Sequence, residues 1–492
     1  MKKKIILMII CAIMLQICGI GGFVKETSAK QILWSKGPNP DNLASESAII
    51  MDINSGTILY EKNTEKKQYP ASITKIMTTL LCLENASLTD TVTFSYEAVN
   101  SIEPGSSHIG IKANEQLKME DCLYGIMLMS ANEVCNGVAE HIAGSIEGFV
   151  DMMNERAKQL GCKNTHFANP NGLFLENHYT CAYDMALIAR EAMKNPMFKK
   201  ITGTKSYIIP KTNIENKRCL YNKHEMLVSH NFPQYRYDYC IGGKTGYTNL
   251  ARYTLVTFAK KDNMELLCVI MKSDNSPYVE PNEYTDTTKL FDFAFDNFES
   301  HSIESKIEND DSEVKYSLFS KYNSVFDEEN SPLYIEENAS IVLPKGAKVS
   351  DAEKNVNYYE NPIDDNGVSR IGEINYEYNG KNAGSAVILY DSSKIETAEI
   401  NKHVTDYVNE LDEEIDKKQE ELEQKEKEKN NKAGMPIWKN KIFIGIVIVV
   451  VVIIAYIIGV SIYKARLRKR YFGSYRNFNR KGNKFKRKNY KF

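Results

Sequence analysis

A single stretch near the end of the chain limits what this protein can be. Residues Ile442–Tyr463 form a run of 22 residues without one charged side chain, rich in isoleucine and valine. At a rise of about 1.5 Å per residue, such a helix crosses a hydrocarbon core about 30 Å thick. Because so continuous an apolar surface is rare in a soluble domain, we predict a transmembrane helix at residues 441–463 rather than a buried core helix.

Both ends of the chain predict how it is oriented. Residues 464–492 hold 13 Lys or Arg and no acidic residue, and positive charge beside a membrane span favours the cytoplasmic side. Residues 1–29 begin MKKK, continue with an apolar stretch and end in Thr-Ser-Ala, which is typical of a secretory signal peptide. An uncleaved N-terminal anchor is the alternative. We therefore expect a single-pass plasma-membrane protein with a basic cytoplasmic tail and residues 30–440 outside the cytoplasm.

Charge and composition exclude several classes of function. The net charge is −2, but the two ends carry +3 and +13, which leaves −18 on residues 30–463. So acidic a body argues against nucleic-acid binding. The eight cysteines after the signal lack a C-x-x-C pair and are expected to be buried free thiols. The eight histidines form no H-E-x-x-H or H-x-H pattern, so neither a metal nor another cofactor is expected.

The extracytoplasmic part divides into three segments. Residues 30–299 alternate strand-like and helix-like patterns, with an early hairpin and late strands on either side of several helices, which predicts an α/β (α+β) arrangement. Residues 300–400 contain short β-rich runs separated by Asn, Asp, Gly and Pro, which predicts a small all-β domain. Residues 401–440 are rich in Glu and Lys with apolar residues at helical spacing, so a solvated helical stalk is favoured over a coiled coil.

The pattern S-x-x-K at Ser72–Lys75 is the first candidate for chemistry. Apolar residues after Pro70 follow helical spacing, which places Ser72 at the positive end of a buried helix. Lys75, three residues on, shares its face. A serine hydroxyl needs an adjacent base to become a nucleophile, and a lysine serves only if its pKa is lowered. Taken alone, the pair also fits a helix cap and a surface charge.

Two further motifs follow in the chain. Ser130-Ala131-Asn132 is an S-x-N pattern 58 residues after Ser72, and Lys244-Thr245-Gly246, the one K-T-G, comes 114 residues later. K-T-G also fits a glycine turn that leads into an edge strand. The order of the three motifs matches the signature of penicillin-binding proteins and serine β-lactamases.

The surrounding sequence makes the resemblance specific. The segments YPASITKIMTTLL, GIMLMSANEV, NTHFANPNGL, HYTCAYDMALIARE and GGKTGYT resemble the low-molecular-weight penicillin-binding proteins that are serine D-alanyl-D-alanine carboxypeptidases. The likeness runs through residues 44–298, and the following β-rich segment resembles that family's C-terminal domain. The resemblance implies a penicillin-binding/serine β-lactamase-like catalytic domain. It also implies that the substrate is a peptidoglycan pentapeptide stem ending in D-Ala-D-Ala, and that β-lactams bind covalently.

The resemblance also implies a role for each matched residue. Ser72 would attack the carbonyl between the two D-alanines, Lys75 would take its proton, and Ser130 would relay a proton to the leaving amine. The remaining residues would bind and orient the substrate: Asn132 beside Lys75, Lys244 as a cation, Thr245 on the terminal carboxylate, Gly246 under the substrate backbone, and the N–H groups of Ser72 and Tyr247 as the oxyanion hole. Water would then release the acyl-enzyme.

Two departures from the family and three rival functions stay open. Many relatives have an arginine before the last helix of the catalytic domain, and residues 281–288 contain none. Well-known members end in an amphipathic helix on the bilayer rather than a span. No E-x-x-L-N of the class A β-lactamases lies between Ser130 and Lys244, which disfavours a β-lactamase. A transpeptidase would share the acyl-enzyme, and a non-catalytic sensor is disfavoured by the intact motifs.

Overall fold

The computed structural model describes residues 32–228, 232–274, 281–303, 306–307, 316–317, 333–337, 339–365 and 367–391. The predicted signal peptide, stalk, transmembrane helix and cytoplasmic tail all lie outside these ranges. Within them, no helix combines the length and the apolar character needed to span a bilayer.

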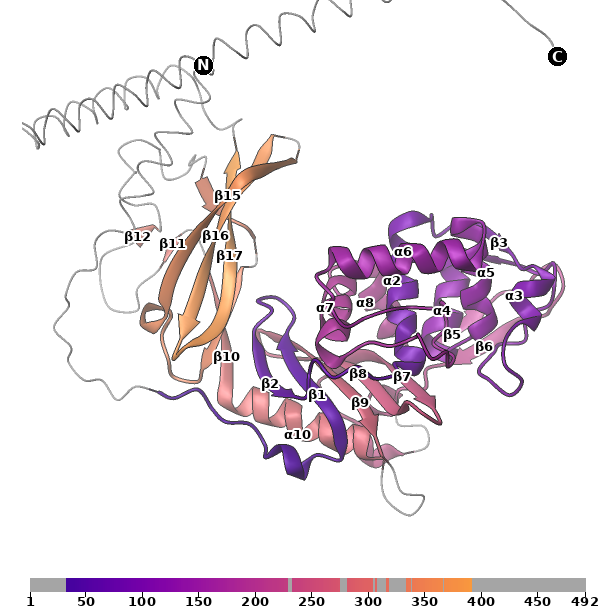
Figure 1. The fold of residues 1–492 in the computed structure, drawn as a ribbon, viewed down its shortest axis with the longest axis horizontal. Helices are drawn as coiled ribbons and strands as arrows, with labels where there is room; N and C mark the ends of the chain where they lie inside the picture. The colour runs from indigo at the N-terminus through magenta and orange to yellow at the C-terminus, as the bar shows by residue number, and fades with distance from the viewer. Residues whose placement is uncertain are drawn as a thin grey trace, which may run out of the picture. The chain divides into compact units, whose positions relative to one another are not determined.

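A five-stranded antiparallel sheet forms the centre of the catalytic region (Figure 1). Its order is β2-β1-β9-β8-β7, so the N-terminal hairpin pairs with strands from the end of the region, as the sequence predicted. The strands are β1 (Ser45–Asp52), β2 (Ile58–Lys62), β7 (Cys240–Thr248), β8 (Arg252–Lys261) and β9 (Met264–Ser273). This order leaves β7 at one edge of the sheet, where its outer side can meet a ligand.

Both faces of the sheet are covered, which explains why its inner strands are apolar throughout. Successive side chains point to opposite faces of a strand: Ile49 and Met51 join the core on one side, and Ala48 and Ile50 join the core on the other. The first core is built mainly with helices α2, α4, α5, α6, α7 and α8, and the second mainly with α10. Figure 1 shows α10 on one side of the sheet and the helical group on the other. The α/β prediction is confirmed.

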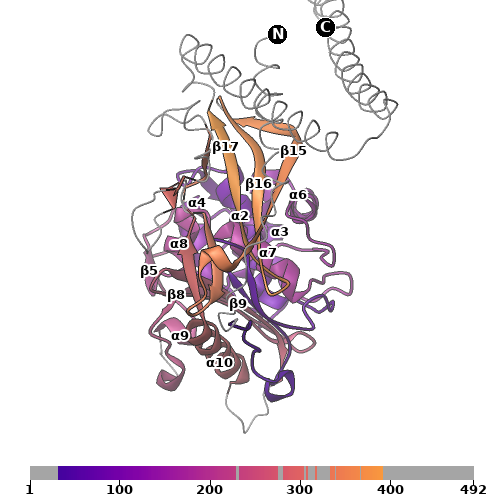
Figure 2. The same cartoon turned by 90° about the vertical axis from the view of Figure 1, so that its left-hand side faces the viewer.

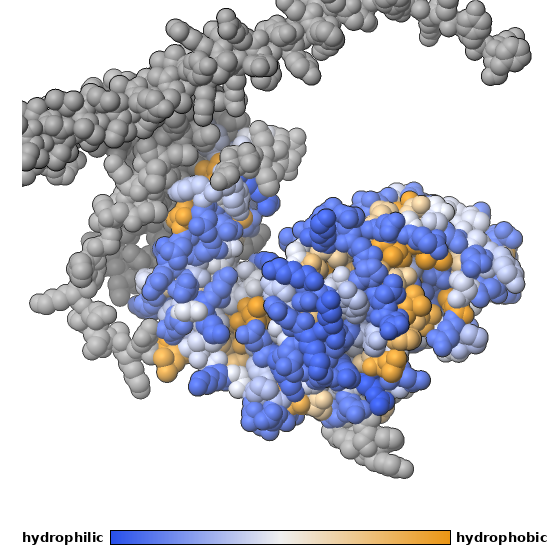
Figure 3. Space-filling model, in the orientation of Figure 1, coloured by the Kyte–Doolittle hydropathy of each residue, from blue (hydrophilic) through white to orange (hydrophobic). Residues whose placement is uncertain are grey.

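The helices lie between the two halves of the sheet in the sequence. They are α2 (Lys75–Asn85), α3 (Tyr96–Asn100), α4 (Met119–Met129), α5 (Asn132–Ala143), α6 (Ile146–Gln159), α7 (Ala182–Ala192), α8 (Pro196–Thr202), α9 (Glu225–Val228) and α10 (Asn282–Asn297). Two small hairpins accompany them, β3 (Thr91–Thr93) with β4 (Gln116–Lys118) and β5 (Ser206–Ile209) with β6 (Arg218–Tyr221). On the face seen in Figure 3, hydrophilic residues dominate, and hydrophobic residues gather around the helical group.

The segment after α10 is built from strands, as predicted. Three long strands, β15, β16 and β17, lie side by side (Figures 1 and 2). With the short strand β13 they form a sheet in the order β13-β17-β16-β15. The strands are β10 (Phe298–Ser302), β11 (Lys306–Ile307), β12 (Tyr316–Ser317), β13 (Leu333–Ile335), β14 (Ser340–Pro344), β15 (Glu353–Asp365), β16 (Val368–Tyr378) and β17 (Lys381–Asp391). Ile374 and Tyr376 of β16 are buried with Ala386 and Ile388 of β17, which gives this sheet one apolar face.

One local detail differs from the sequence prediction, and the structure also decides between two interpretations of the K-T-G motif. The helix expected to begin near Ser72 starts as a single 3₁₀ turn, η3 (Ala71–Thr74), and becomes α-helical at Lys75. The K-T-G triplet lies inside edge strand β7, so the alternative of a glycine turn ahead of an edge strand is wrong. Of the eight cysteines, six are buried as expected, Cys162 is half-buried and Cys219 is exposed.

Candidate active site

Ser72 lies on a strained turn that leads into helix α2. The residue before it, Ala71, has a φ of 52°, in the left-handed region that non-glycine residues adopt at a cost of about 1–3 kcal/mol. The carbonyl oxygen of Ala71 lies against Gly172, where an added Cβ would come within 2.0 Å of it. Ser72 itself is half-buried. The turn therefore presents the hydroxyl at the helix start, and a close backbone contact holds it there.

Lys75 reaches the Ser72 hydroxyl from one turn further along. Its side chain is fully buried, and Nζ lies 3.0 Å from Ser72 Oγ and 2.7 Å from Asn132 Oδ1. The carbonyl oxygen of Asn171 accepts a third hydrogen bond from the same nitrogen. The pKa of Lys75 is lowered to about 8, mainly by burial and to a smaller extent by the charge of Lys223, while Cys135 and Glu133 act to raise it.

All three contacts can be kept when the Lys75 amine is neutral. Asn132 Oδ1 and the Asn171 carbonyl can only accept, so a neutral Nζ donates its two hydrogens to them. The lone pair is then free to point at Ser72 Oγ, whose O–H can donate. Lys75 therefore lies where a general base for Ser72 has to lie.

The S-x-N motif occupies the junction of two helices. Ser130 ends α4 with a φ of 62°, a second left-handed residue beside the site, and Asn132 begins α5. Ser130 Oγ accepts a hydrogen bond from Lys244 Nζ at 3.2 Å. The Asn132 N–H donates to the carbonyl of Ser107 at 2.9 Å, which fixes the preceding loop against the motif.

Strand β7 brings the K-T-G residues up to the nucleophile. A Cβ added to Gly246 would lie 2.9 Å from the backbone nitrogen of Ser72 and 3.2 Å from Ala71 Cβ. Only a residue without a side chain allows this approach. Thr245 is half-buried, and Tyr247, which is 50% exposed, packs its ring 4.7 Å from that of Tyr253.

Lys244 forms a second buried amine beside Lys75. It is 2% exposed and donates to Ser130 Oγ at 3.2 Å and to the Thr245 carbonyl at 2.7 Å. Burial lowers its pKa well below the usual value, and the charges of Lys75 and Lys223 add to that. A carboxylate arriving at the site would favour the charged form of Lys244 again.

Sequence reasoning missed the loop that supports the nucleophile helix. Besides the Asn171 carbonyl, this loop supplies His178, whose Nε2 lies 2.9 Å from Thr74 Oγ1 while its Nδ1 accepts the Ala168 N–H at 3.0 Å. Burial lowers the pKa of His178 to about 3, so the ring is neutral and donates to Thr74. The quoted segment NTHFANPNGL contains Asn171, but a backbone carbonyl has no signature of its own in a sequence.

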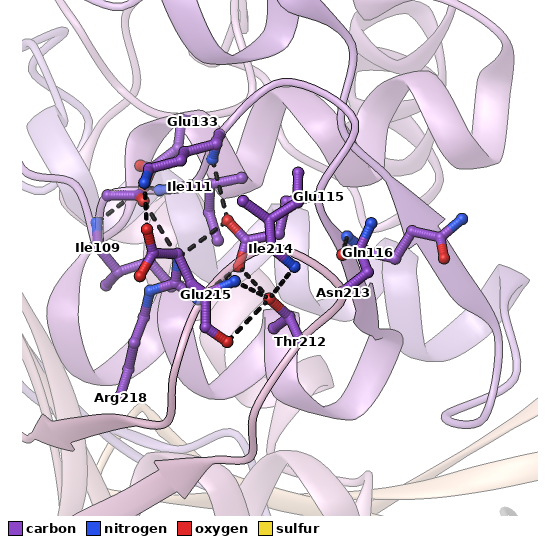
Figure 4. Close-up of polar contacts among 12 residues, drawn as sticks. Ile109, Ile111, Glu115, Gln116, Glu133, Thr212, Asn213, Ile214, Glu215 and Arg218 are labelled. Carbon is purple, nitrogen blue, oxygen red and sulfur yellow. Dashed lines mark hydrogen bonds and ion pairs between the residues drawn. The ribbon is translucent and has the colours of Figure 1, made fainter.

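Sequence reasoning also missed two glutamates, Glu133 and Glu115, that fix the loop before α4 (Figure 4). Glu133 Oε1 accepts N–H bonds from Ile109 at 2.8 Å and Ile111 at 3.4 Å. Fully buried Glu115 pairs with Arg218 of β6 at 2.6 and 2.9 Å. Burial raises the pKa of Glu115, but the Arg218 and backbone hydrogen bonds outweigh it and hold that pKa below its usual value.

All the residues named by the three motifs are thus brought together around Ser72. Among the described residues, no group of three or more His, Cys, Asp or Glu side chains could hold a metal ion. The chemistry open to the arrangement is nucleophilic: a serine with a buried amine as its base, a second hydroxyl within reach of another amine, and a strand edge beside them.

Known proteins share this arrangement of sequence and fold. A family model described as D-alanyl-D-alanine carboxypeptidase matches residues 35–275. The D-alanyl-D-alanine carboxypeptidase DacF of Bacillus subtilis is 34% identical over 69% of this chain and 82% of its own length. DacA of Haemophilus influenzae is 31% identical over 71% of this chain and 85% of its own length.

A solved structure extends the likeness beyond the catalytic region. The crystal structure of penicillin binding protein 5 from Haemophilus influenzae is 29% identical, with a TM-score of 0.53, over 72% of this chain and 98% of its own. The penicillin-binding fold is therefore confirmed. With the family match and the two relatives, this shows that the chain belongs to the D-alanyl-D-alanine carboxypeptidase family.

Proposed function

We propose that this protein is a serine D-alanyl-D-alanine carboxypeptidase that removes the terminal D-alanine from peptidoglycan pentapeptide stems. The observation that carries this proposal is the fully buried Lys75 Nζ, 3.0 Å from Ser72 Oγ, with its two other contacts made to obligate acceptors. Membership of the family supports the choice of substrate.

Acylation follows from this geometry. Ser72 Oγ forms a bond to the carbonyl carbon between the two D-alanines as its proton passes to the neutral Lys75 Nζ. The oxyanion forms beside the backbone N–H of Ser72, and that of Tyr247 completes the oxyanion hole. The bond from that carbon to the leaving nitrogen breaks when the nitrogen gains a proton through Ser130, which contacts Lys244.

The remaining residues position the substrate. Asn132 holds Lys75 through its Oδ1, and its side-chain N–H groups orient the substrate amide. The terminal carboxylate lies at Thr245 and Lys244, and the substrate backbone extends along β7, where Gly246 leaves room. Water then attacks the ester on Ser72, and Lys75 Nζ accepts the proton of that water. A β-lactam acylates Ser72 by the same route.

Free D-alanine is the direct readout of this proposal. The full-length protein is incubated with an acyl pentapeptide ending in D-Ala-D-Ala, and D-alanine is measured for the wild type and Ser72→Ala. We expect release by the wild type alone, together with a penicilloyl adduct on the Ser72 peptide in mass spectrometry. Release of D-alanine by Ser72→Ala at the wild-type rate would refute the assignment, and fast turnover of penicillin would favour a β-lactamase.

We also propose that residues 441–463 anchor the enzyme in the plasma membrane, with the catalytic region outside and the basic tail inside. The support comes from the sequence: 22 uncharged residues are followed by KARLRKR. A protein cut after residue 440 should leave the membrane fraction, whereas the full chain should resist extraction at alkaline pH. Retention of the shortened protein in washed membranes would contradict the anchor.

A further inference from the structure

Many family members have an arginine before the last helix of the catalytic domain, near the terminal carboxylate of the substrate. Residues 275–288, which lead into and begin α10, contain no Arg or Lys and include Glu280, Glu283 and Asp286. Lys75 is committed to Ser72, Asn132 and Asn171, and Lys244 donates to Ser130 and Thr245. This segment therefore offers no cation to the carboxylate, and other parts of the fold are the place to look for one.

Lys223 has a backbone that is fixed beside the K-T-G strand. Its neighbour His224 is buried against Gly243, where an added Cβ would come within 2.4 Å of His224 Nε2. On the other side, Asn222 Nδ2 donates to the carbonyls of Thr202 at 3.3 Å and Thr204 at 3.0 Å.

Thr202 completes the link to the strand. Its hydroxyl accepts the Gly243 N–H at 2.9 Å and donates to the Gly243 carbonyl at 3.0 Å. The residue before Lys223 is thus tied to β7 through Thr202, and the residue after it packs on β7 directly. The Cα of Lys223 is therefore held in place next to β7 without help from its own side chain.

The side chain of Lys223 extends from there towards the S-x-N motif. It is exposed, and its Nζ lies 3.5 Å from Ser107 Oγ, a long contact that leaves the ammonium free to bind a stronger partner. Ser107 is the residue whose carbonyl accepts the Asn132 N–H. The charge of Lys223 also acts to lower the pKa of both Lys75 and Lys244, which places it near both amines.

We propose that Lys223 is a substrate-binding residue that pairs with the α-carboxylate of the leaving D-alanine. This inference rests on the proposed function, which puts the leaving amine at Ser130 and the carboxylate at Thr245. Lys223 lies between these two positions, because its backbone is anchored beside β7 and its ammonium lies beside the loop that holds Asn132. A carboxylate is the one charged group on the departing residue, and an ammonium with free donors is its natural partner.

The test compares two thioester substrates that differ in charge at one point. Both have the same acyl-D-alanyl part, and the thiol leaving group carries either a free carboxylate or its methyl ester. Thioesters are reactive enough to keep the neutral substrate measurable. The full-length wild type is compared with Lys223→Gln and Lys223→Arg. The control variant is Lys217→Gln, which removes an exposed lysine on the other side of strand β6.

We expect Lys223→Gln to lower kcat/KM for the carboxylate substrate by about 10- to 100-fold, the usual value of a charged hydrogen bond. The neutral substrate should change by less than about twofold, since no charge pair is lost. Lys223→Arg should recover part of the loss, and Lys217→Gln should behave as wild type.

Equal losses on both substrates would overturn the inference and show that Lys223 supports the site in general. Unchanged rates on both would overturn it as well. Thermal melting of Lys223→Gln within a few degrees of wild type rules out misfolding as the cause of a loss. The proposed function fails separately, if the wild type forms no acyl-enzyme at Ser72 from either thioester.

Discussion

The rate at which penicillin acylates Ser72 should rise with pH and reach half of its plateau near pH 8. Lys75 accepts the Ser72 proton only when it is uncharged, and burial lowers its pKa from 10.5 to about 8. A group with that pKa is neutral in about one molecule in eleven at pH 7 and in about half at pH 8. With an ordinary pKa of 10.5 it would be neutral in about one molecule in 3,000 at pH 7.

Stopped-flow acylation by a fluorescent penicillin, from pH 6 to pH 10, measures this dependence. A tenfold rise per pH unit below pH 7 should bend to a plateau above pH 9. Melting temperatures over the same range control for unfolding. Lys75→Arg should not acylate at any of these pH values, because a guanidinium keeps its proton. A rate that is flat from pH 6 to pH 9, or one that still climbs tenfold per unit at pH 10, would refute a buried amine as the base.

Three further substitutions probe the surroundings of the site. Gly246→Ala should slow penicillin acylation about 100-fold, since the added Cβ intrudes beside the nucleophile; unchanged acylation would contradict that contact. Glu133→Gln should move the midpoint of the pH–acylation curve to lower pH, because the carboxylate acts to raise the pKa of Lys75; a shift to higher pH would contradict it. Arg218→Met should destabilise the fold by about 3–5 kcal/mol in denaturant titration by leaving buried Glu115 without the positive charge that it pairs with. The loss of stability should shrink below pH 4.5, because the Glu115 carboxyl then becomes protonated in the wild type as well as in the variant. A loss of stability that does not depend on pH would argue against the charge pair.

The sequence carried enough information for the sheet and the motif residues. The apolar run around Ile49 and Ile50 predicts a strand of a hairpin, and the spacing of Ser72 and Lys75 predicts a shared helix face. The contact between Lys75 and Asn132, 57 residues apart, has no local signal. Only the order of the three motifs and the resemblance to a family indicated it.

Other parts of the site could not be predicted because they depend on backbone conformation. Ala71 and Ser130 adopt left-handed φ values of 52° and 62°, and neither residue type favours that region. Asn171 contributes a carbonyl oxygen, which every residue has. Lys223 was overlooked because its role depends on the packing of His224 against Gly243, a contact between segments that the pattern of apolar residues does not connect.

Two kinds of feature at the site raise the free energy of the folded state. Left-handed φ values at non-glycine residues cost about 1–3 kcal/mol each, and holding Lys75 protonated while buried costs about 3 kcal/mol at neutral pH, from its lowered pKa. Because that folded-state pKa lies below the unfolded one, the unfolded chain binds the extra proton between pH 8 and 10.5. Stability should therefore rise with pH across that window. The rest of the fold offsets these costs around the nucleophile, and the same desolvation that destabilises the ammonium is what makes the amine a base for Ser72.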